Sequence, residues 1–138
     1  MNFRLLLVLC ASLLPILSAK ADLSPSAYAS MRASAPDCFV VQILGTGTSP
    51  GWLFKSDKTS VKARVIGVVR STAGIVPGDE IRIRYRNERH PAGWVGPAPI
   101  PVPTKNTQYM VYLKSGKGKR VFEPAAGATS FMTGTGAP

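Results

Sequence analysis

The sequence contains very few of the side chains on which catalysis and metal binding usually depend. Its 138 residues include one histidine, His90, and two cysteines, Cys10 and Cys38. One histidine cannot build a multi-histidine zinc site, and Cys38 is its only soft companion outside the leading segment. A Cys38–His90 nucleophile pair is the catalytic alternative, but no spacing argues for it, and loop histidines are usually solvated. The sequence therefore predicts a protein with no metal, no cofactor and no catalytic function.

Acidic residues are also scarce, with 7 Asp and Glu against 17 Lys and Arg. Asp79 and Glu80 are adjacent, so on a strand they point to opposite faces and cannot act together as a carboxylate pair. We expect Asp79 instead to shape the turn that follows Gly78. The glycine-rich stretch GTGTSPG, residues 45–51, lacks the Gly-Lys-Ser/Thr ending of a phosphate-binding loop. These patterns exclude Asp79 and Glu80 as a catalytic carboxylate pair and GTGTSPG as a phosphate-binding loop.

The first 21 residues have the layout of a secretory signal peptide. Arg4 precedes an apolar stretch over 5–17, which Pro15 interrupts, and Ala19-Lys20-Ala21 offers small residues at a cleavage site. We expect cleavage after Ala21 and an exported protein, extracellular or periplasmic. An uncleaved membrane anchor is the alternative, although the apolar stretch is short for a bilayer span. No second long apolar segment follows, so no transmembrane span is expected after cleavage.

The remaining chain is strongly basic. The formal net charge is +10, and removal of Arg4 and Lys20, with no acid in the same segment, leaves +8. Such a charge attracts acidic partners over long range. For an exported protein the candidates are an anionic polysaccharide, a lipid surface or an acidic protein, and nucleic acid is unlikely. Cys38 then has no intramolecular disulfide partner; we expect it to be buried in its apolar run, with an intermolecular disulfide as the alternative.

Strand patterns dominate the chain after an N-terminal segment over 22–36. Ser24 and Pro25 favour a short helix there, which Pro36 would end. The expected strands are β-branched or alternate in polarity, and GTGTSPG is expected to end the first of them. Five strands in so small a domain favour a closed sheet, because closure removes free edges. We predict an all-β domain over 37–131, a five-stranded OB-like Greek-key barrel with at most one short helix, and a flexible tail over 132–138. The strands are expected at 38–44, 61–70, 80–86, 107–114 and 120–124.

Four segments carry a resemblance to a known family. VKARVIGVVRS, GDEIRIRY, YMVYLK and FEPAAGATSF, between Cys38 and Phe131, resemble the netrin-like module shared with tissue inhibitors of metalloproteinases. The resemblance implies an OB-type barrel. The inhibitors grip a catalytic zinc through a Cys-x-Cys at the mature N-terminus, which this chain lacks together with the family's disulfides. The resemblance therefore supports the fold more than it supports protease inhibition.

A row of arginines is the first candidate binding surface. In EIRIRYR, the residues Ile81, Ile83 and Tyr85 are expected to enter the core, and neighbouring side chains on the other face lie about 7 Å apart. If the second and third expected strands pair, basic side chains of the second strand lie on the same outer face as the arginines. One interpretation is a solvated face whose long stems cover apolar surface and keep the sheet soluble. The other is an electrostatic binding site. The face comprises Arg82, Arg84 and Arg86, with Lys62 and Arg64 beside them.

A long loop over 87–106 is the second candidate. Its sequence HPAGWVGPAPIPVP combines Trp94 with five prolines, which stiffen the backbone and remove donors. Trp52 lies in another predicted loop, SPGWLF. Exposed aromatics on loops are frequent binding elements; the alternative is that both indoles plug the ends of the barrel. The combined prediction is a non-catalytic module that binds an acidic partner through the basic face and the Pro/Trp loop, with metalloprotease inhibition or a structural envelope role as alternatives.

Overall fold

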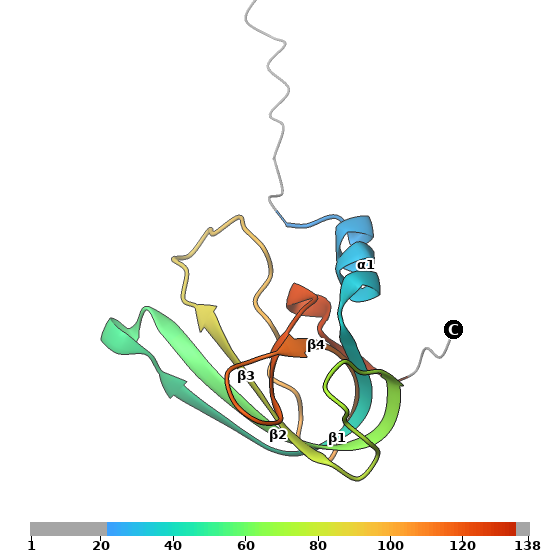
Figure 1. Cartoon of the computed structure of the whole chain (residues 1–138). Coiled ribbons are helices and arrows are strands. Elements are labelled where there is room, and N and C mark those ends of the chain that lie inside the picture. Colours follow the sequence, from blue (N-terminus) through green and yellow to red (C-terminus); the bar gives the residue numbers. More distant parts are fainter. Residues whose placement is uncertain (1–21, 135–138) are drawn as a thin grey trace, which may run out of the picture.

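The computed structural model describes residues 22–134, and the expected signal peptide and the end of the expected tail lie outside this range. The described chain forms strands, one α-helix and two 3-10 helices (Figure 1). Among the described residues, no helix is both long and apolar enough to cross a membrane. The elements are α1 Pro25–Ser34, β1 Asp37–Pro50, η1 Trp52–Phe54, β2 Ser56–Arg70, β3 Glu80–Glu88, β4 Gln108–Ser115, β5 Val121–Pro124, η2 Gly127–Thr129 and β6 Phe131–Thr133.

Five strands close into a barrel, which confirms the predicted fold class. Antiparallel pairing joins β1 to β2, β2 to β3, β5 to β4 and β4 back to β1, and a parallel pairing joins β3 to β5. The short β6 pairs with β4 as well. β2 lies between β1 and β3, and β3 is joined to β5 at Arg82 and Ile83.

The core follows the alternation that the sequence predicts. Ile81 and Ile83 of β3 are buried while their neighbours on the strand are exposed. Phe39 of β1 and Phe122 of β5 meet edge to face at the centre, with ring centroids 5.6 Å apart. Because successive side chains of a strand point to opposite faces, the residues between these buried ones point out to solvent. The buried cluster also includes Val41, Ile43, Val61, Ala63, Val65, Tyr109, Val111, Leu113 and Phe131.

The β1–β2 hairpin is longer than the sequence analysis predicted. The expectation that GTGTSPG ends the first strand is wrong, because β1 continues to Pro50 and pairs with β2 as far as Asp57. Thr48 faces Thr59 across the hairpin, with their hydroxyl oxygens 3.3 Å apart, a pair that suits a sheet. The extended ladder carries the turn between β1 and β2 away from the barrel (Figure 1).

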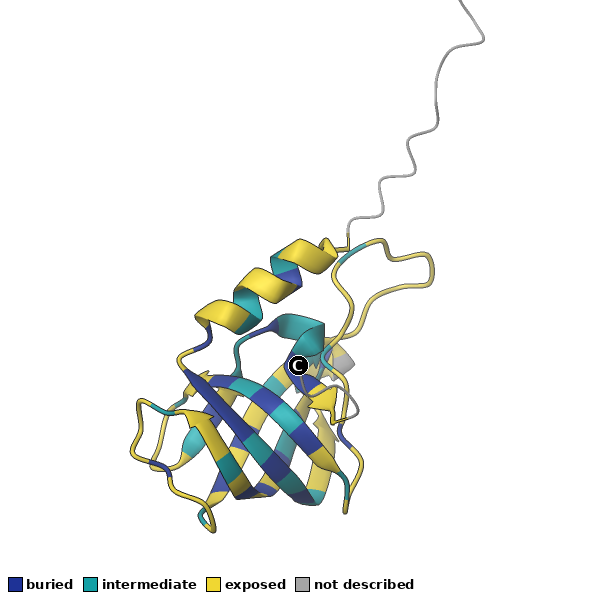
Figure 2. Ribbon diagram, turned by 90° about the vertical axis from the view of Figure 1, so that its right-hand side faces the viewer, coloured by how far each residue is buried: buried dark blue, intermediate teal, exposed yellow. Residues whose placement is uncertain are grey.

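The predicted helix is present and begins as expected. The Ser24 hydroxyl accepts a hydrogen bond from the backbone N–H of Ala27, at 3.2 Å, and Pro25 opens the first turn. Figure 2 shows α1 outside one end of the barrel, with most of its surface exposed. At its other end, the Arg70 guanidinium donates to the Ala35 carbonyl at 2.8 Å. The helix therefore lies away from the outer face of β2 and β3.

A buried carboxylate fixes the start of β1. Asp37 is fully buried, and it accepts hydrogen bonds from the backbone N–H of Thr72 at 2.7 Å and from the Thr72 hydroxyl at 3.2 Å. Such bonds compensate for the cost of removing a carboxylate from water. They hold the connection between β2 and β3 against the barrel, and this connection leads directly into the arginine-bearing strand.

Candidate functional site

The outward side chains of β2 and β3 form a continuous basic surface, which we call the basic strip. Antiparallel pairing places Lys58 opposite Arg86, Ser60 opposite Arg84 and Lys62 opposite Arg82. All of these cations are exposed. The predicted outward direction of the arginine row is therefore confirmed. The basic strip comprises Lys58, Lys62, Arg82, Arg84 and Arg86.

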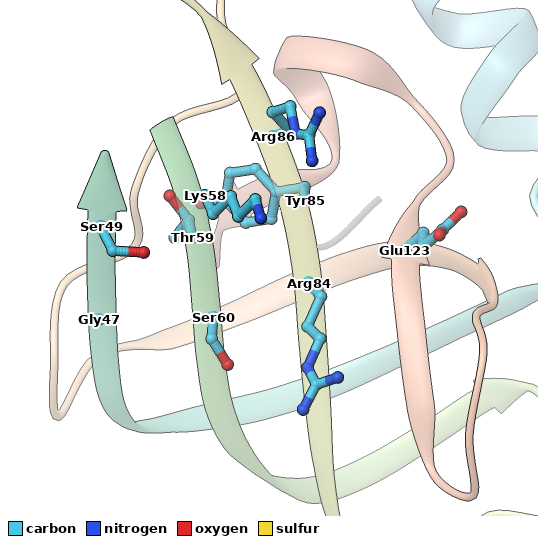
Figure 3. Close-up of a pocket in the computed structure, with 9 residues that line it drawn as sticks. All are labelled: Gly47, Ser49, Lys58, Thr59, Ser60, Arg84, Tyr85, Arg86 and Glu123. Atoms are coloured by element: carbon cyan, nitrogen blue, oxygen red, sulfur yellow. The ribbon is translucent and has the colours of Figure 1, made fainter. Parts of the chain in front are cut away.

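Small residues make the surface beside the strip low and open. On β1, Gly47 lies opposite Ser60, and Ser49 lies opposite Lys58. A Cβ added at Gly47 would meet no heavy atom within 4 Å. The result is a shallow hollow of about 550 Å³ between these short residues and the long basic side chains (Figure 3). Arg84 and Glu123 lie on its opposite rim.

Most cations of the strip have no acidic partner. Lys62 and Arg64 both contact Glu80, with N–O distances of 3.3 and 3.2 Å. The hydrogen bonds from Lys62 and then Arg64 lower the pKa of the Glu80 carboxyl. The remaining salt bridges of residues 22–134 involve Arg89, Lys114 and Arg120. Within the described chain, four strip cations therefore lack a salt bridge: Lys58, Arg82, Arg84 and Arg86.

The basic surface continues beyond both ends of the strip. Near Arg82, the turn between β4 and β5 contributes Lys119 and Arg120 to a hollow of about 490 Å³. The backbone N–H of Arg82 donates to the Arg120 carbonyl at 3.0 Å, which fixes this turn to β3. Near Arg86, a hollow of about 500 Å³ is lined by Trp52, by the cations Lys55, Lys58, Arg86 and Arg89, and by Ser56 and Glu88. The surface is thus elongated along β3.

The two tryptophans differ in their surroundings. Trp52 lies at the tip of the hairpin with 83% of its surface exposed, whereas Trp94 is 52% exposed. The His90 ring stacks on Trp94, with centroids 3.9 Å apart and an interplanar angle of 6°. A Cβ at Gly96 would lie 2.2 Å from the Trp94 indole, so the ring also packs on that glycine. The proposal that both indoles plug the barrel is wrong. Trp94 is engaged within its own loop, and Trp52 is free.

The Pro/Trp loop is attached to the strand that carries the arginines. It begins after Glu88 rather than at 87, because Asn87 still belongs to β3. The Asn87 side chain exchanges two hydrogen bonds with the backbone of Ile100, at 2.7 and 2.9 Å. The Tyr85 hydroxyl donates to the Pro101 carbonyl at 2.7 Å, and burial raises the pKa of Tyr85 to about 12. The loop is therefore a fixed wall beside the end of the strip.

Sequence reasoning missed several cations of this surface, among them Lys58 and Lys119. Lys58 was outside the expected second strand, although the alternation of Lys58, Ser60 and Lys62 was a usable signal. Lys119 belongs to SGKGK, which reads only as a turn, and its position near Arg82 depends on the parallel β3–β5 pairing. The local sequence pattern was therefore enough to predict Lys58, whereas predicting Lys119 required knowledge of the strand topology.

Cys38 is not positioned to act at the surface. Only 2% of its surface is exposed, and burial raises the pKa of its thiol. A buried thiol with a raised pKa is a poor nucleophile and a poor metal ligand. Burial agrees with the expectation from the sequence.

Comparisons with protein families, with curated proteins and with solved structures find no match for this chain. The resemblance to netrin-like modules therefore remains a prediction from sequence pattern.

Proposed function

We propose that this protein is a non-catalytic binding module that recognises an acidic partner through the basic strip. The observation that carries the proposal is that Lys58, Arg82, Arg84 and Arg86 have no salt-bridge partner within the described chain. Like charges about 7 Å apart on one strand repel each other. An acidic ligand removes this repulsion, and arginine binds carboxylate, sulfate or phosphate groups with two parallel hydrogen bonds.

The dimensions of the strip favour an extended or multiply charged partner. Arg82 and Arg86 are four residues apart on one strand, which corresponds to about 13 Å. Lys119 extends the basic surface at one end, and Lys55 extends it at the other. The hollows between these side chains are open and shallow, so they suit a chain or a charged surface better than a single small anion. The hydroxyl of Ser60 adds a neutral hydrogen-bonding group at the centre.

The Pro/Trp loop supports this surface from one side. Arg86 shares a hollow of about 280 Å³ with His90, Trp94 and Ile100. Because the indole face of Trp94 is stacked on His90, we assign the loop a wall-forming role and assign the charge recognition to the strip.

Inhibition of a metalloprotease has no comparable support. The zinc-gripping Cys-x-Cys of the resembling family has no counterpart here, and Cys38 is buried. A structural envelope role does not explain why four cations of one surface lack acidic partners.

The salt dependence of binding tests the proposed function. We expect the protein to bind a fluorescently labelled heparin fragment at low salt, with an affinity that falls linearly on a log–log plot against salt concentration. Release of counterions at four cations predicts a slope of roughly −3 to −4. Fluorescence anisotropy over a salt series measures this slope. Absence of binding at low salt both to heparin and to anionic lipid vesicles, or a slope near zero, would contradict the proposal.

A further inference from the structure

The tip of the β1–β2 hairpin presents two large apolar side chains to solvent. Trp52 is 83% exposed and Leu53 is 58% exposed. Leu53 also has a positive φ of 54°, a conformation that is uncommon for a bulky residue. Adjacent exposed apolar side chains on a projecting turn mark a contact with another surface. Neither side chain is needed to fill the barrel, so the arrangement has no structural explanation within the domain.

The turn that carries these side chains is firmly built. The Gly51 N–H donates to the Ser56 carbonyl across the base of the turn, and a Cβ at Gly51 would lie only 2.8 Å from that carbonyl oxygen. The Arg89 N–H donates to the Lys55 carbonyl at 2.9 Å. The Arg89 guanidinium contacts both carboxylate oxygens of Asp57, at 2.6 and 3.1 Å. These bonds fix the turn to β2 and to the end of β3, with Trp52 directed outward.

Cations surround this apolar tip. Trp52 shares a hollow with four cations, Lys55, Lys58, Arg86 and Arg89, and with one acidic residue, Glu88. Arg89 is paired with Asp57, whereas the other three have no salt bridge within residues 22–134. The tip therefore combines an exposed indole and leucine with three cations that make no salt bridge, at the end of the basic strip, where cations outnumber the single acidic residue Glu88.

We propose that the hairpin tip docks on an anionic lipid bilayer, with Trp52 and Leu53 inserted at the interface and Lys55, Lys58 and Arg86 on the lipid phosphates. The inference rests on the proposed function, because it names a lipid surface as the acidic partner of the strip. Indole rings favour the headgroup region of bilayers. Each cation near an anionic surface increases binding roughly five-fold.

Two observations favour lipid over a soluble polyanion. A sugar ring or a base can stack on Trp52, but neither uses the adjacent Leu53, whereas acyl chains accommodate both. The outward side chains of β2 and β3 include no aromatic residue, and single-stranded nucleic acid is held largely by bases stacked on aromatic platforms. The chemistry of the tip therefore fits a surface that is apolar beneath a layer of negative charge.

The test compares binding to vesicles with binding to heparin in solution. The exported protein is mixed with phosphatidylcholine vesicles with and without phosphatidylglycerol, and partition is measured by sedimentation. We expect the double variant Trp52→Ser/Leu53→Ser to lose about ten-fold or more in partition to the anionic vesicles, while binding heparin as the unmodified protein does. The control Val95→Ser/Val102→Ser removes exposed apolar side chains elsewhere and should leave partition unchanged.

A second measurement does not depend on altering the tip. In Trp94→Phe, Trp52 is the single tryptophan, and its emission should shift to the blue and be quenched by brominated lipids in anionic vesicles. Unquenched emission of Trp52, or unchanged partition of the tip variant, overturns the proposed insertion into lipid. The proposed function remains intact in that case if the protein still binds heparin. If the tip variant loses heparin binding as strongly as it loses partition to vesicles, Trp52 is a platform for a soluble ligand. That result also overturns the proposed insertion into lipid. Failure of the unmodified protein to bind either heparin or vesicles overturns the proposed function itself.

Discussion

Replacement of Arg82, Arg84 and Arg86 with serine is expected to weaken binding of a polyanion by about thirty- to one-hundred-fold at low salt. Each exposed ion pair contributes up to about 1 kcal/mol, and three such losses together approach a hundred-fold change in affinity. The salt dependence should flatten as well, by roughly one unit of slope for each cation removed. The side chains point outward from a strand whose core residues are unchanged, so the variant should retain the fold. Anisotropy titrations with labelled heparin at two salt concentrations measure both effects.

A charge-matched comparison separates a specific surface from overall basicity. Arg84→Ser/Arg86→Ser and Arg32→Ser/Lys105→Ser each remove two positive charges. Arg32 lies on helix α1, and Lys105 lies in the loop before β4; neither lines the hollows of the strip. We expect a large loss of affinity for the first pair and a small loss for the second. Equal losses would show that net charge alone attracts the ligand, and the strip would no longer be a site.

Raising the pH from 10 to 12 is expected to destabilise the protein through Tyr85. The ordinary phenol pKa is near 10, and burial raises the folded-state pKa of Tyr85 to about 12. The folded protein therefore favours the protonated phenol, so its contribution is complete below pH 10 and is lost as the pH rises through 12. The loss amounts to roughly 1–3 kcal/mol of the free energy of unfolding. Urea unfolding at several alkaline pH values measures it.

The variant Tyr85→Phe isolates this contribution. Phenylalanine cannot ionise, so the difference in stability between the two proteins should change across this pH range. The lysines and the other tyrosines titrate in both proteins and therefore do not contribute to the difference. At neutral pH the variant should be modestly less stable, by about 1 kcal/mol, because the hydrogen bond to the Pro101 carbonyl is lost. A pH-independent difference between the two proteins would show that the Tyr85 phenol ionises as freely in the fold as in water.

Local alternation was sufficient to predict the arginine row and the core beneath it. Ile81 and Ile83 are buried and the arginines between and after them are exposed, as a period of two requires. The length of the β1–β2 hairpin was not predictable in this way. Glycine, proline and serine in GTGTSP favour a turn, but pairing with Thr59 and its neighbours keeps the segment in the sheet. Pairing with the neighbouring strand therefore outweighed the intrinsic preference of these residues for a turn.

The charge balance of the site depends on contacts between distant segments. Glu80 makes salt bridges to both Lys62 and Arg64 because the register of β2 and β3 places the three side chains together. Lys119 reaches the strip only because β5 pairs with β3. The stacking of Trp94 on His90 occurs in a loop that has no periodic pattern. None of these neighbours follows from spacing along the chain, so the sequence predicted a basic face but not which of its cations remain unpaired.

The most direct test of the account is to map the bound ligand on the isotopically labelled protein by NMR. On addition of a short heparin fragment, the amide signals that move should cluster on the outer face of β2 and β3, around Lys58, Ser60, Arg82, Arg84 and Arg86. Signals of helix α1 and of β6 should stay in place. Perturbations confined to α1, β6 or the Pro/Trp loop, with the signals of β2 and β3 unmoved, would contradict the claim that the unpaired cations of this barrel form its binding surface.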